Sequence, residues 1–510
     1  MRTTAVVAFW GVLTGLRIVG GQRIDEPWGG GGCKDDTDCS LGGECFIPVR
    51  FFYSGLASEI PHLHVTSSRH SFRSWDWGRV HIKNQIADLN PLVPAHARSV
   101  KLHYQDPGRP AGPIGTCKCD PWFTGLTCAL LNFQPPESDQ QGLCHTGFDS
   151  YFSWGGRAIP APQNAGGAPQ KWHLYASFMC NHASLESWTT VSSSGHFVSD
   201  SPVGPFEWSP EQCEGDVCTP AIIPWSHNTV ALENTDAVPS AQWQIWHIGD
   251  GVVNASVFSP CFNKSQVGAV DHVAGVATAA AASATIPLNP GQMVYVATSA
   301  TPSGPWSRAF KNRPLRIKYD EGGAWPQSAT NPSPLVLPNG SIRLYFTSPD
   351  KANPCGLVDN CIGVAQSNEG WEGPFLPFAH HLTNLESEDP NVFVDPRGNY
   401  HLLTNINTCH TRCPRGVECG GHAWSRDGLA FSELHVGAFG PYITFANGTG
   451  WPNAYAERPL VTQNNDGSPL AFYVGLGRSE YHDCCNWGML FCTKELAEAG
   501  GKCGPTVQPR

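Results

Sequence analysis

Three short sequence elements recur along residues 144–495 and limit the folds that this chain can adopt. The first is a strand followed by a polar turn and a Gly-Pro-aromatic triplet, at Gly204-Pro205-Phe206, Gly304-Pro305-Trp306 and Gly373-Pro374-Phe375, with a degenerate copy at 422–431. The second is an aromatic and apolar strand that begins at Trp172, Trp243, Ile342, Tyr400 and Ala471. The third is a polar residue that leads into a short apolar strand, at Asn228, Asn331, Asp389 and Arg458. Regular recurrence of this kind is typical of proteins built from repeated units.

The length of the repeat predicts the architecture. Residues 144–495 divide into five units of about 70 residues, which is the length of a four-stranded antiparallel sheet with generous loops. Radial repetition of such sheets buries their faces and protects their edges, whereas a β-sandwich does not easily supply five copies. The sequence therefore predicts an all-β protein whose main domain is a five-bladed β-propeller.

Composition supports this interpretation and excludes several classes of protein. The chain has 510 residues with 54 Gly, 43 Pro and 18 Trp, and only 15% of it is charged. Such a chain favours short strands and tight turns over long helices or disorder. The net charge of −11, with no long run of Lys or Arg, makes nucleic acid and anionic membranes poor partners.

The N-terminus and the cysteines predict export. Arg2 precedes an apolar stretch at 3–16, and the small residues Gly20 and Gly21 follow, which is the layout of a secretory signal peptide. We therefore expect residues 1–21 to be removed and the protein to be secreted without membrane insertion. Twenty Cys and sequons at Asn254, Asn263, Asn339 and Asn447 fit a disulfide-bonded extracellular glycoprotein. The cysteine and histidine cluster at 409–422 is better explained by disulfides than by zinc, and we predict no metal and no cofactor.

Six cysteines within residues 33–128 form a separate pattern, Cys33-x5-Cys39-x5-Cys45 followed by Cys117-x-Cys119-x8-Cys128. The segment resembles an EGF-like module, because 117–128 matches the C-terminal hairpin of that family. The resemblance implies the disulfides Cys33–Cys45, Cys39–Cys117 and Cys119–Cys128, and a surface for a protein partner. Residues 46–116 depart from the family as a long insert, which is either a surface loop or an error in the gene model. Residues 129–143 are then a linker and 496–510 a C-terminal tail.

Propeller geometry predicts that equivalent residues of the blades meet at the axis. The innermost strands run beside the axis, so the residues that begin these strands share one rim. These residues are His227-Asn228, Asn331, Glu388-Asp389 and Glu457-Arg458, with Asp149 or Trp154 for the first blade. They differ in charge, which indicates a shared asymmetric site rather than five ordinary turns.

Two of these segments, Glu388-Asp389-Pro390-Asn391-Val392-Phe393 and Tyr455-Ala456-Glu457-Arg458-Pro459, resemble a known family. They look like the five-bladed propeller superfamily of glycoside hydrolases that includes arabinanases, β-xylosidases, levansucrases and invertases. The resemblance implies cleavage of extracellular or cell-wall glycans by paired carboxylates. It implies that Asp389 orients or stabilises and that Glu457 is the general acid. Glu388 is a further catalytic candidate, and Asp149, which no family motif surrounds, is the candidate base or nucleophile of the first blade.

The predicted substrate-binding residues are His227, Asn228, Asn331, Arg458, His401, His422 and Trp154, with Trp225 and Trp451 as further candidates for stacking on sugars. Simpler interpretations stay open. Asp389 is also an ordinary turn initiator, Glu388 also a structural partner for Arg458, and the histidines also buried hydrogen-bonding groups.

Two functions follow from these residues. The first is a secreted glycoside hydrolase, favoured by the acidic motifs of two blades. The alternative is a catalytically inactive carbohydrate-binding or adhesion propeller, favoured by the missing acid of the first blade. For the hydrolase we expect Asp389→Asn and Glu457→Gln to abolish turnover while folding stays intact.

Overall fold

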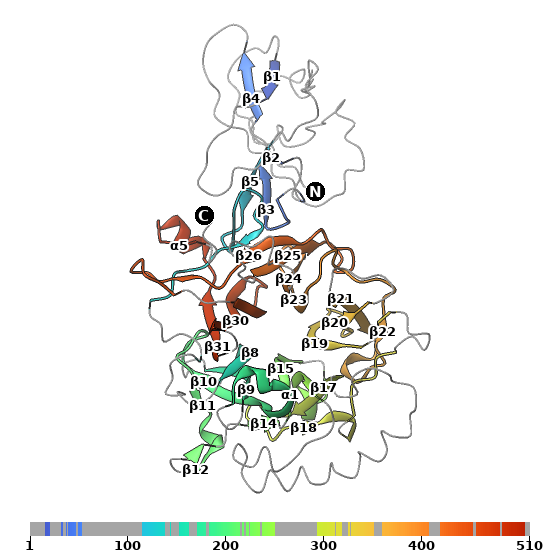
Figure 1. Cartoon of the computed structure of the whole chain (residues 1–510). Coiled ribbons are helices and arrows are strands. Elements are labelled where there is room, and N and C mark those ends of the chain that lie inside the picture. Colours follow the sequence, from blue (N-terminus) through green and yellow to red (C-terminus); the bar gives the residue numbers. More distant parts are fainter. Residues whose placement is uncertain are drawn as a thin grey trace, which may run out of the picture. The chain divides into compact units, whose positions relative to one another are not determined.

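The computed structural model in Figure 1 has two compact units, Met1–Ala129 and Leu130–Arg510. The structure describes residues 16–20, 32–33, 37, 39–46, 49–53, 115–137, 143, 152–162, 171–179, 183–214, 217–218, 221–223, 225–234, 237–249, 293–311, 313–318, 325–326, 328–350, 360–406, 419–451, 455–479 and 482–504. Among these residues, no helix is long and apolar enough to cross a membrane.

The first unit contains short strands and two disulfides. Its strands are β1 (Leu16–Gly20), β2 (Gly32–Cys33), β3 (Gly43–Phe46), β4 (Val49–Tyr53), β5 (Gly115–Cys119) and β6 (Phe123–Thr124). Strand β1 pairs with β4, and β5 lies between β2 and β3. Disulfides join Cys39 to Cys117 and Cys119 to Cys128, two of the three pairs that the EGF-like resemblance implies. The side chains of Cys33 and Cys45, residues 1–15 and most of the insert lie outside the described residues.

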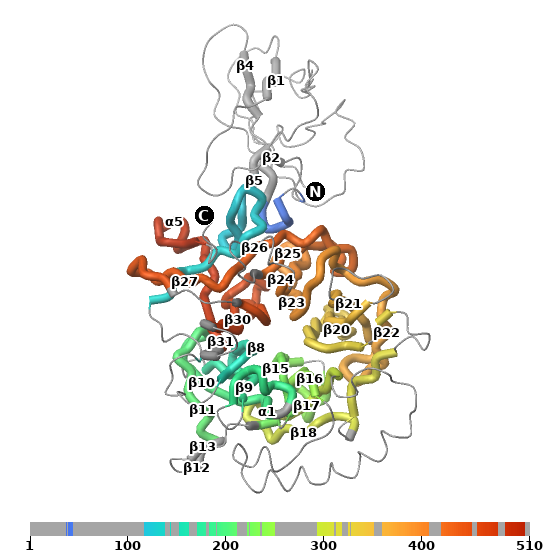
Figure 2. Tube along the Cα trace, viewed as in Figure 1, coloured from blue at the N-terminus to red at the C-terminus, as the bar shows by residue number. Residues whose placement is uncertain are grey.

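The second unit is a five-bladed propeller, as the repeat predicts. Blade one has the strand order β11-β10-β9-β8, with β14 also paired to β10, and blades two to four are β15-β16-β17-β18, β19-β20-β21-β22 and β23-β24-β25-β26. Blade five has β29-β30-β31. The innermost strands β8, β15, β19, β23 and β29 contact one another in that cyclic order, so β29 closes the ring against β8. In Figure 2 the red strand β30 of blade five lies beside the blue-green strand β8 of blade one.

The strands of blades one and two are β8 (Ser153–Pro160), β9 (Trp172–Met179), β10 (Ser192–Ser199), β11 (Glu207–Trp208), β14 (Ala221–Ile223), β15 (His227–Glu233), β16 (Trp243–Gly249), β17 (Met293–Ser299) and β18 (Ser307–Arg308). Those of blades three to five are β19 (Thr330–Val336), β20 (Ile342–Pro349), β21 (Asn360–Ser367), β22 (Leu376–Pro377), β23 (Glu388–Val394), β24 (Tyr400–Ile406), β25 (Cys419–Ser425), β26 (His435–Phe439), β29 (Tyr455–Gln463), β30 (Pro469–Ser479) and β31 (His482–Leu490).

Short elements complete the unit. They are the helices α1 (Trp188–Val191) and α5 (Lys494–Glu498), the 3-10 turns η3 (Leu185–Ser187), η4 (Pro210–Gln212), η5 (Pro239–Ala241), η7 (Ala309–Lys311) and η8 (Gly370–Glu372), and the strands β7 (Leu130–Leu131), β12 (Cys213–Glu214), β13 (Val217–Cys218), β27 (Ile443–Thr444) and β28 (Gly450–Trp451).

A repeated serine explains the polar turn of the first sequence element. The hydroxyl oxygen at the end of the third strand accepts a hydrogen bond from the backbone N–H two residues later. The bond measures 3.0 Å in blade one and 3.2 Å in blades two to four, at Ser199, Ser299, Ser367 and Ser425. A side-chain acceptor of this kind stabilises a tight turn at the end of a strand.

The aromatic residues of the repeat pack between blades. A second-strand aromatic of one blade meets the aromatic of the Gly-Pro-aromatic element, or of its degenerate copy, in the next blade. The three edge-to-face pairs are Tyr175–Trp306 at 5.6 Å, Trp246–Phe375 at 6.0 Å and Tyr345–Phe431 at 6.4 Å. Such pairs stabilise the contact beyond the area that they bury. The aromatic second strand of one blade and the Gly-Pro-aromatic element of the next blade therefore form one contact between blades.

Residues on the N-terminal side of blade one complete blade five. The backbone N–H of Gln134 donates to Leu490 O at 2.9 Å, and the N–H of Leu143 donates to Asn486 O at 2.8 Å. In return, the N–H of Cys492 donates to Asn132 O at 3.0 Å. Both ends of this unit thus share one blade, which closes the ring of blades. The stretch 129–143, predicted as a linker, supplies several of these hydrogen bonds.

Candidate functional site

Each innermost strand carries one residue in the left-handed region of backbone conformation, next to a shift in its pairing with the second strand. The φ angles are 39°, 54°, 49°, 58° and 58° at Gly155, Asn228, Asn331, Asp389 and Arg458. We call these five residues the axial ring. A bulge of this kind bends the strand and redirects a side chain. Gly adopts this conformation freely and Asn and Asp tolerate it, but it is unfavourable for Arg, so contacts must hold Arg458 in place.

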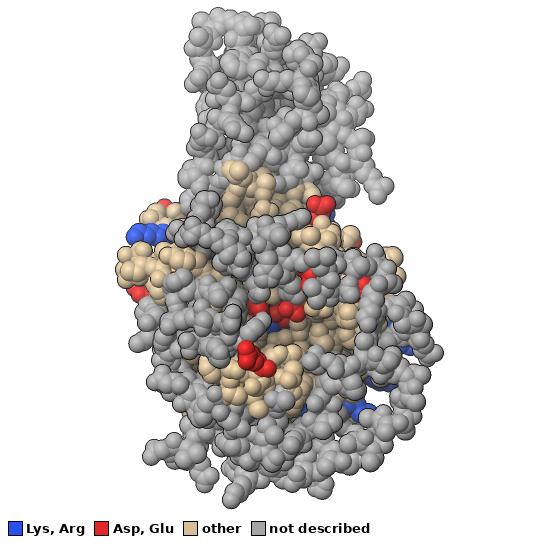
Figure 3. Space-filling model, viewed as in Figure 1, with Lys and Arg blue, Asp and Glu red and all other residues tan. Residues whose placement is uncertain are grey.

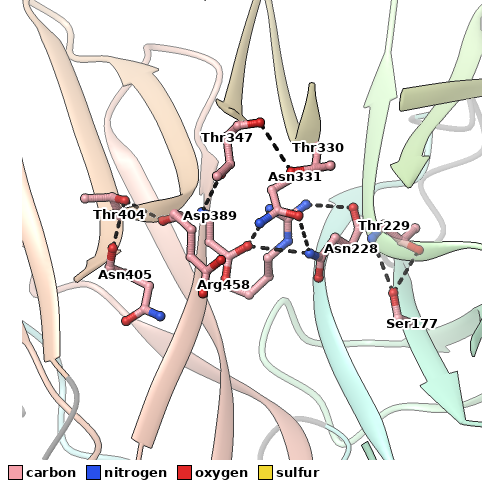
Figure 4. A network of polar contacts seen from close by, with 11 residues as sticks. Ser177, Asn228, Thr229, Thr330, Asn331, Thr347, Asp389, Thr404, Asn405 and Arg458 are labelled. Carbon is pink, nitrogen blue, oxygen red and sulfur yellow. Dashed lines mark hydrogen bonds and ion pairs between the residues drawn. The ribbon is translucent and has the colours of Figure 1, made fainter. Parts of the chain in front are cut away.

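Hydrogen bonds link the axial ring across four blades. Arg458 Nη1 lies 3.2 Å from Asp389 Oδ1, and Nη2 donates to the backbone carbonyl of Asn228 at 2.7 Å. Asn228 Nδ2 donates to Asn331 Oδ1 at 2.8 Å and lies 3.5 Å from Asp389 Oδ1. Figure 4 shows the guanidinium of Arg458 between Asp389 and Asn228. The predicted residues Asn228, Asn331, Asp389 and Arg458 therefore meet at one point.

Gly155 completes the axial ring, and its lack of a side chain leaves space for Arg458. A Cβ atom on Gly155 would lie 2.4 Å from Cγ of Arg458. The Arg458 side chain thus occupies the space that a side chain of blade one would otherwise fill. The acid that the glycoside hydrolase resemblance implies for blade one is not at this position, and Asp149 lies outside the described residues.

The charges of the axial ring are buried. Arg458 has no exposed surface and Asp389 is 3% exposed. Burial lowers the pKa of Arg458, while Asp389, through its charge and its hydrogen bond, and the charge of Glu388 raise it again. A guanidinium remains charged even so. The pair is therefore a desolvated ion pair, in which each charge depends on the other.

A second layer consists of the residues that precede the axial ring in each blade, Trp154, His227, Thr330, Glu388 and Glu457. Glu388 and Glu457 are half-buried. The Thr330 hydroxyl donates to Thr347 O at 3.2 Å. The Trp154 ring packs against Gly475 and is only 3% exposed. Figure 3 shows acidic side chains near the centre of the propeller on this face.

His227 extends the site toward helix α1. Its Nδ1 lies 2.8 Å from Ser192 Oγ, and its imidazole stacks on the Trp188 ring with centroids 4.7 Å apart and planes at 23°. Burial, with a smaller contribution from the positive charge of Arg458, lowers the pKa of His227 to about 3. The imidazole is therefore neutral at physiological pH.

Two predicted substrate-binding residues lie elsewhere. His401 in β24 pairs opposite Phe393, five residues along β23 from Glu388. Its Nδ1 lies 2.9 Å from His422 Nε2, and its Nε2 lies 3.5 Å from Asp395 Oδ2. Both histidines are buried, and these contacts join them to each other and to a turn carboxylate. They fit the simpler interpretation as buried hydrogen-bonding groups.

The other stacking candidates are also placed. Trp225 is 5% exposed, and its Nε1 donates to Thr189 O at 2.9 Å. The side chain of Trp451 lies outside the described residues. Sequence reasoning missed Gly155, Ser192 and Trp188. The sequence signal for Gly155 was the Gly155-Gly156 pair at the repeat position of blade one. Trp188 had no such signal, because it lies in a one-turn helix outside the repeat.

Among the described residues, no group of three His, Cys, Asp or Glu side chains is placed to hold a metal ion. Most of the cysteine and histidine cluster at 409–422 lies outside this part of the chain.

Comparison with known proteins gives similarities of structure only. No protein-family model and no curated protein matches the sequence. Among solved structures, Zg3597, a family 117 glycoside hydrolase of the marine bacterium Zobellia galactanivorans, is 13% identical, with 77% of this chain and 97% of that chain covered and a TM-score of 0.40. A thermostable family-43 glycoside hydrolase is 13% identical, with 72% and 98% covered and a TM-score of 0.41. CoXyl43, a β-xylosidase/α-arabinofuranosidase from a compost microbial metagenome, is 10% identical, with 73% and 98% covered and a TM-score of 0.41.

The contact between Gly155 and Arg458 yields a stability prediction. Gly155→Ala combines a left-handed residue with a Cβ only 2.4 Å from Arg458 Cγ. We expect it to lower the free energy of unfolding by about 3 kcal/mol, as measured by urea denaturation. Gly370→Ala is the control, because Gly370 has a φ of 74° with nothing within 4 Å of its Cβ position, and it should cost about 1 kcal/mol. Equal losses for the two variants would contradict the steric argument.

The buried ion pair changes the expectation for Asp389→Asn. The sequence alone predicted that this variant folds normally, but it leaves the Arg458 charge without its carboxylate. We expect a loss of about 3 kcal/mol in the free energy of unfolding. Asp200→Asn is the matched control, since Asp200 forms an exposed pair with Lys171, and it should cost less than about 1 kcal/mol. An Asp389→Asn variant as stable as this control would show that the axial pair does not stabilise the fold.

Proposed function

We propose that the propeller is a glycoside hydrolase whose reaction takes place at the axial ring. The observation that carries the proposal is the ion pair of Asp389 from blade four with buried Arg458 from blade five, because Glu388 and Glu457 directly precede these two residues on the same rim. Glycosidic bonds are cleaved by two carboxyl groups that flank the bond, one as acid and one as base or nucleophile. Blades four and five are neighbours in the ring, so their side chains can reach the same bond.

The contacts support a division of roles among the three acids. Asp389 is buried against Arg458 and suits orientation of the substrate or stabilisation of charge in the transition state. Glu457, which the family resemblance implies as general acid, gives its proton to the leaving-group oxygen. Glu388 then takes the role of base, and receives the proton of the attacking water. Both glutamates are half-buried, which keeps them within reach of a ligand.

Non-hydrolytic glycan binding is a second candidate. One observation favours it: at the axial position of blade one stands Gly155 rather than an acid, and Arg458 occupies the adjoining space. A propeller of this kind would bind a glycan at the same rim and leave it intact. The EGF-like segment would then supply the contact with a protein partner.

Turnover separates the two candidates. Reducing-sugar release from xylotriose, cellotriose and arabinan oligosaccharides would be measured for the wild type, Glu457→Gln and Glu388→Gln. Loss of a general acid or base should lower kcat about 100-fold or more, with binding retained. Glu372→Gln is the control, because Glu372 is an exposed acid of η8 in blade three. If the wild type binds these oligosaccharides but releases no reducing sugar, the result supports the second candidate and contradicts the hydrolase.

We also propose that the protein is secreted. The signal-like N-terminus and the disulfides Cys39–Cys117, Cys119–Cys128 and Cys492–Cys503 support an oxidising compartment. Secreted material should lack residues 1 to about 21, which N-terminal sequencing checks. Recovery of Met1 from the medium would contradict cleavage of a signal peptide.

A further inference from the structure

We propose that Trp188, which stacks on His227, forms the wall of the axial site against which a neutral sugar ring packs. The proposal rests on the proposed glycan function and adds a ligand class and a contact surface to it. The wall belongs to blades one and two, on the other side of the axial ring from the acids of blades four and five.

The first argument is the position of Trp188. Helix α1 lies beside the start of β15, where Trp188 stacks on His227, and Trp188 also packs against the hydrophobic cluster that includes Trp154 of β8. The Trp188 indole stacks on the imidazole of His227, and His227 directly precedes Asn228 of the axial ring. Trp188 is half-buried, whereas Trp154 and Trp225 are almost fully buried. Trp188 therefore retains ring surface for a ligand, and a sugar presents apolar C–H groups that pack on such a surface.

The second argument is the tautomer of His227. Ser192 has one hydroxyl proton, and it donates this proton to the carbonyl of Ser226 at 2.9 Å. Ser192 Oγ is therefore the acceptor in its contact with His227, and Nδ1 carries the imidazole proton. Nε2 of the neutral ring then has an acceptor lone pair, and it receives no hydrogen bond from any described residue.

The third argument is the balance of donors and acceptors. In the proposed reaction Glu388 is ionised and only accepts hydrogen bonds, whereas Glu457 carries a proton that it can donate. Nε2 of His227 is a further acceptor. Sugar hydroxyls both donate and accept, so they match this set. A sulfate or uronate group would face the ionised carboxylate of Glu388, which disfavours anionic glycans.

Calorimetric titration of the full chain with xylotriose and cellotriose tests the wall. Trp188→Ala should weaken binding about tenfold or more, and Trp188→Phe, which keeps an aromatic face, should weaken it less. Trp371→Ala is the matched control, because Trp371 is a half-buried tryptophan that packs on Phe310 in the outer part of blade three. A trisaccharide of glucuronic acid should bind more weakly than either neutral sugar to the wild type.

The outcomes separate this inference from the proposed function. Binding by Trp188→Ala that equals the wild type overturns the wall and leaves the axial acids in place. An equal loss in Trp371→Ala also overturns it, because the effect would then be structural. Tighter binding of the glucuronic acid trisaccharide overturns the ligand class. A wild type that neither binds nor cleaves the neutral trisaccharides overturns the proposed function, and the wall with it.

Discussion

The buried ion pair between Arg458 and Asp389 is the interaction on which the rest of the propeller axis depends. A guanidinium without exposed surface must meet its hydrogen-bonding needs inside the protein. Arg458 of blade five therefore pairs with the carboxylate of Asp389 in blade four and donates to the backbone carbonyl of Asn228 in blade two. Its side chain also lies against Gly155 of blade one. These contacts also offset the unfavourable left-handed backbone of the arginine. The same contacts of Arg458 therefore connect the blades across the axis and determine the charges of the site.

This arrangement gives the two sides of the axis different chemistry. The carboxylates come from blades four and five, whereas blades one and two contribute a glycine, a neutral histidine and a tryptophan. A ligand at the axis thus meets hydrogen-bond acceptors on one side and an aromatic surface on the other. That asymmetry suits a sugar, whose hydroxyls and C–H groups point in different directions. A propeller with five equal blades would lack it.

The sequence predicted the fold and four of the five ring positions, because repetition makes equivalent residues converge however far apart they lie in the chain. The prediction that His401 and His422 bind substrate stays a prediction. The structure places His401 opposite Phe393, near the end of β23 that is distant from Glu388, because β24 begins at the turn that follows β23. Gly155 was missed because a glycine contributes space rather than a chemical group. Trp188 was missed because it lies in a one-turn helix outside the repeat, so the repeat does not predict its position.

Gly155 and Arg458 constrain each other, and this bears on catalysis. Any side chain at 155 would begin 2.4 Å from Cγ of Arg458, so a blade-one acid at this position and the present arginine exclude each other. In the proposed hydrolase the second carboxylate therefore comes from elsewhere on the rim. Among the described rim residues Glu388 is the candidate, and its charge also acts on Arg458. The proposed base and the buried acid that pairs with Arg458 would then be neighbours in one strand of blade four, Glu388 and Asp389.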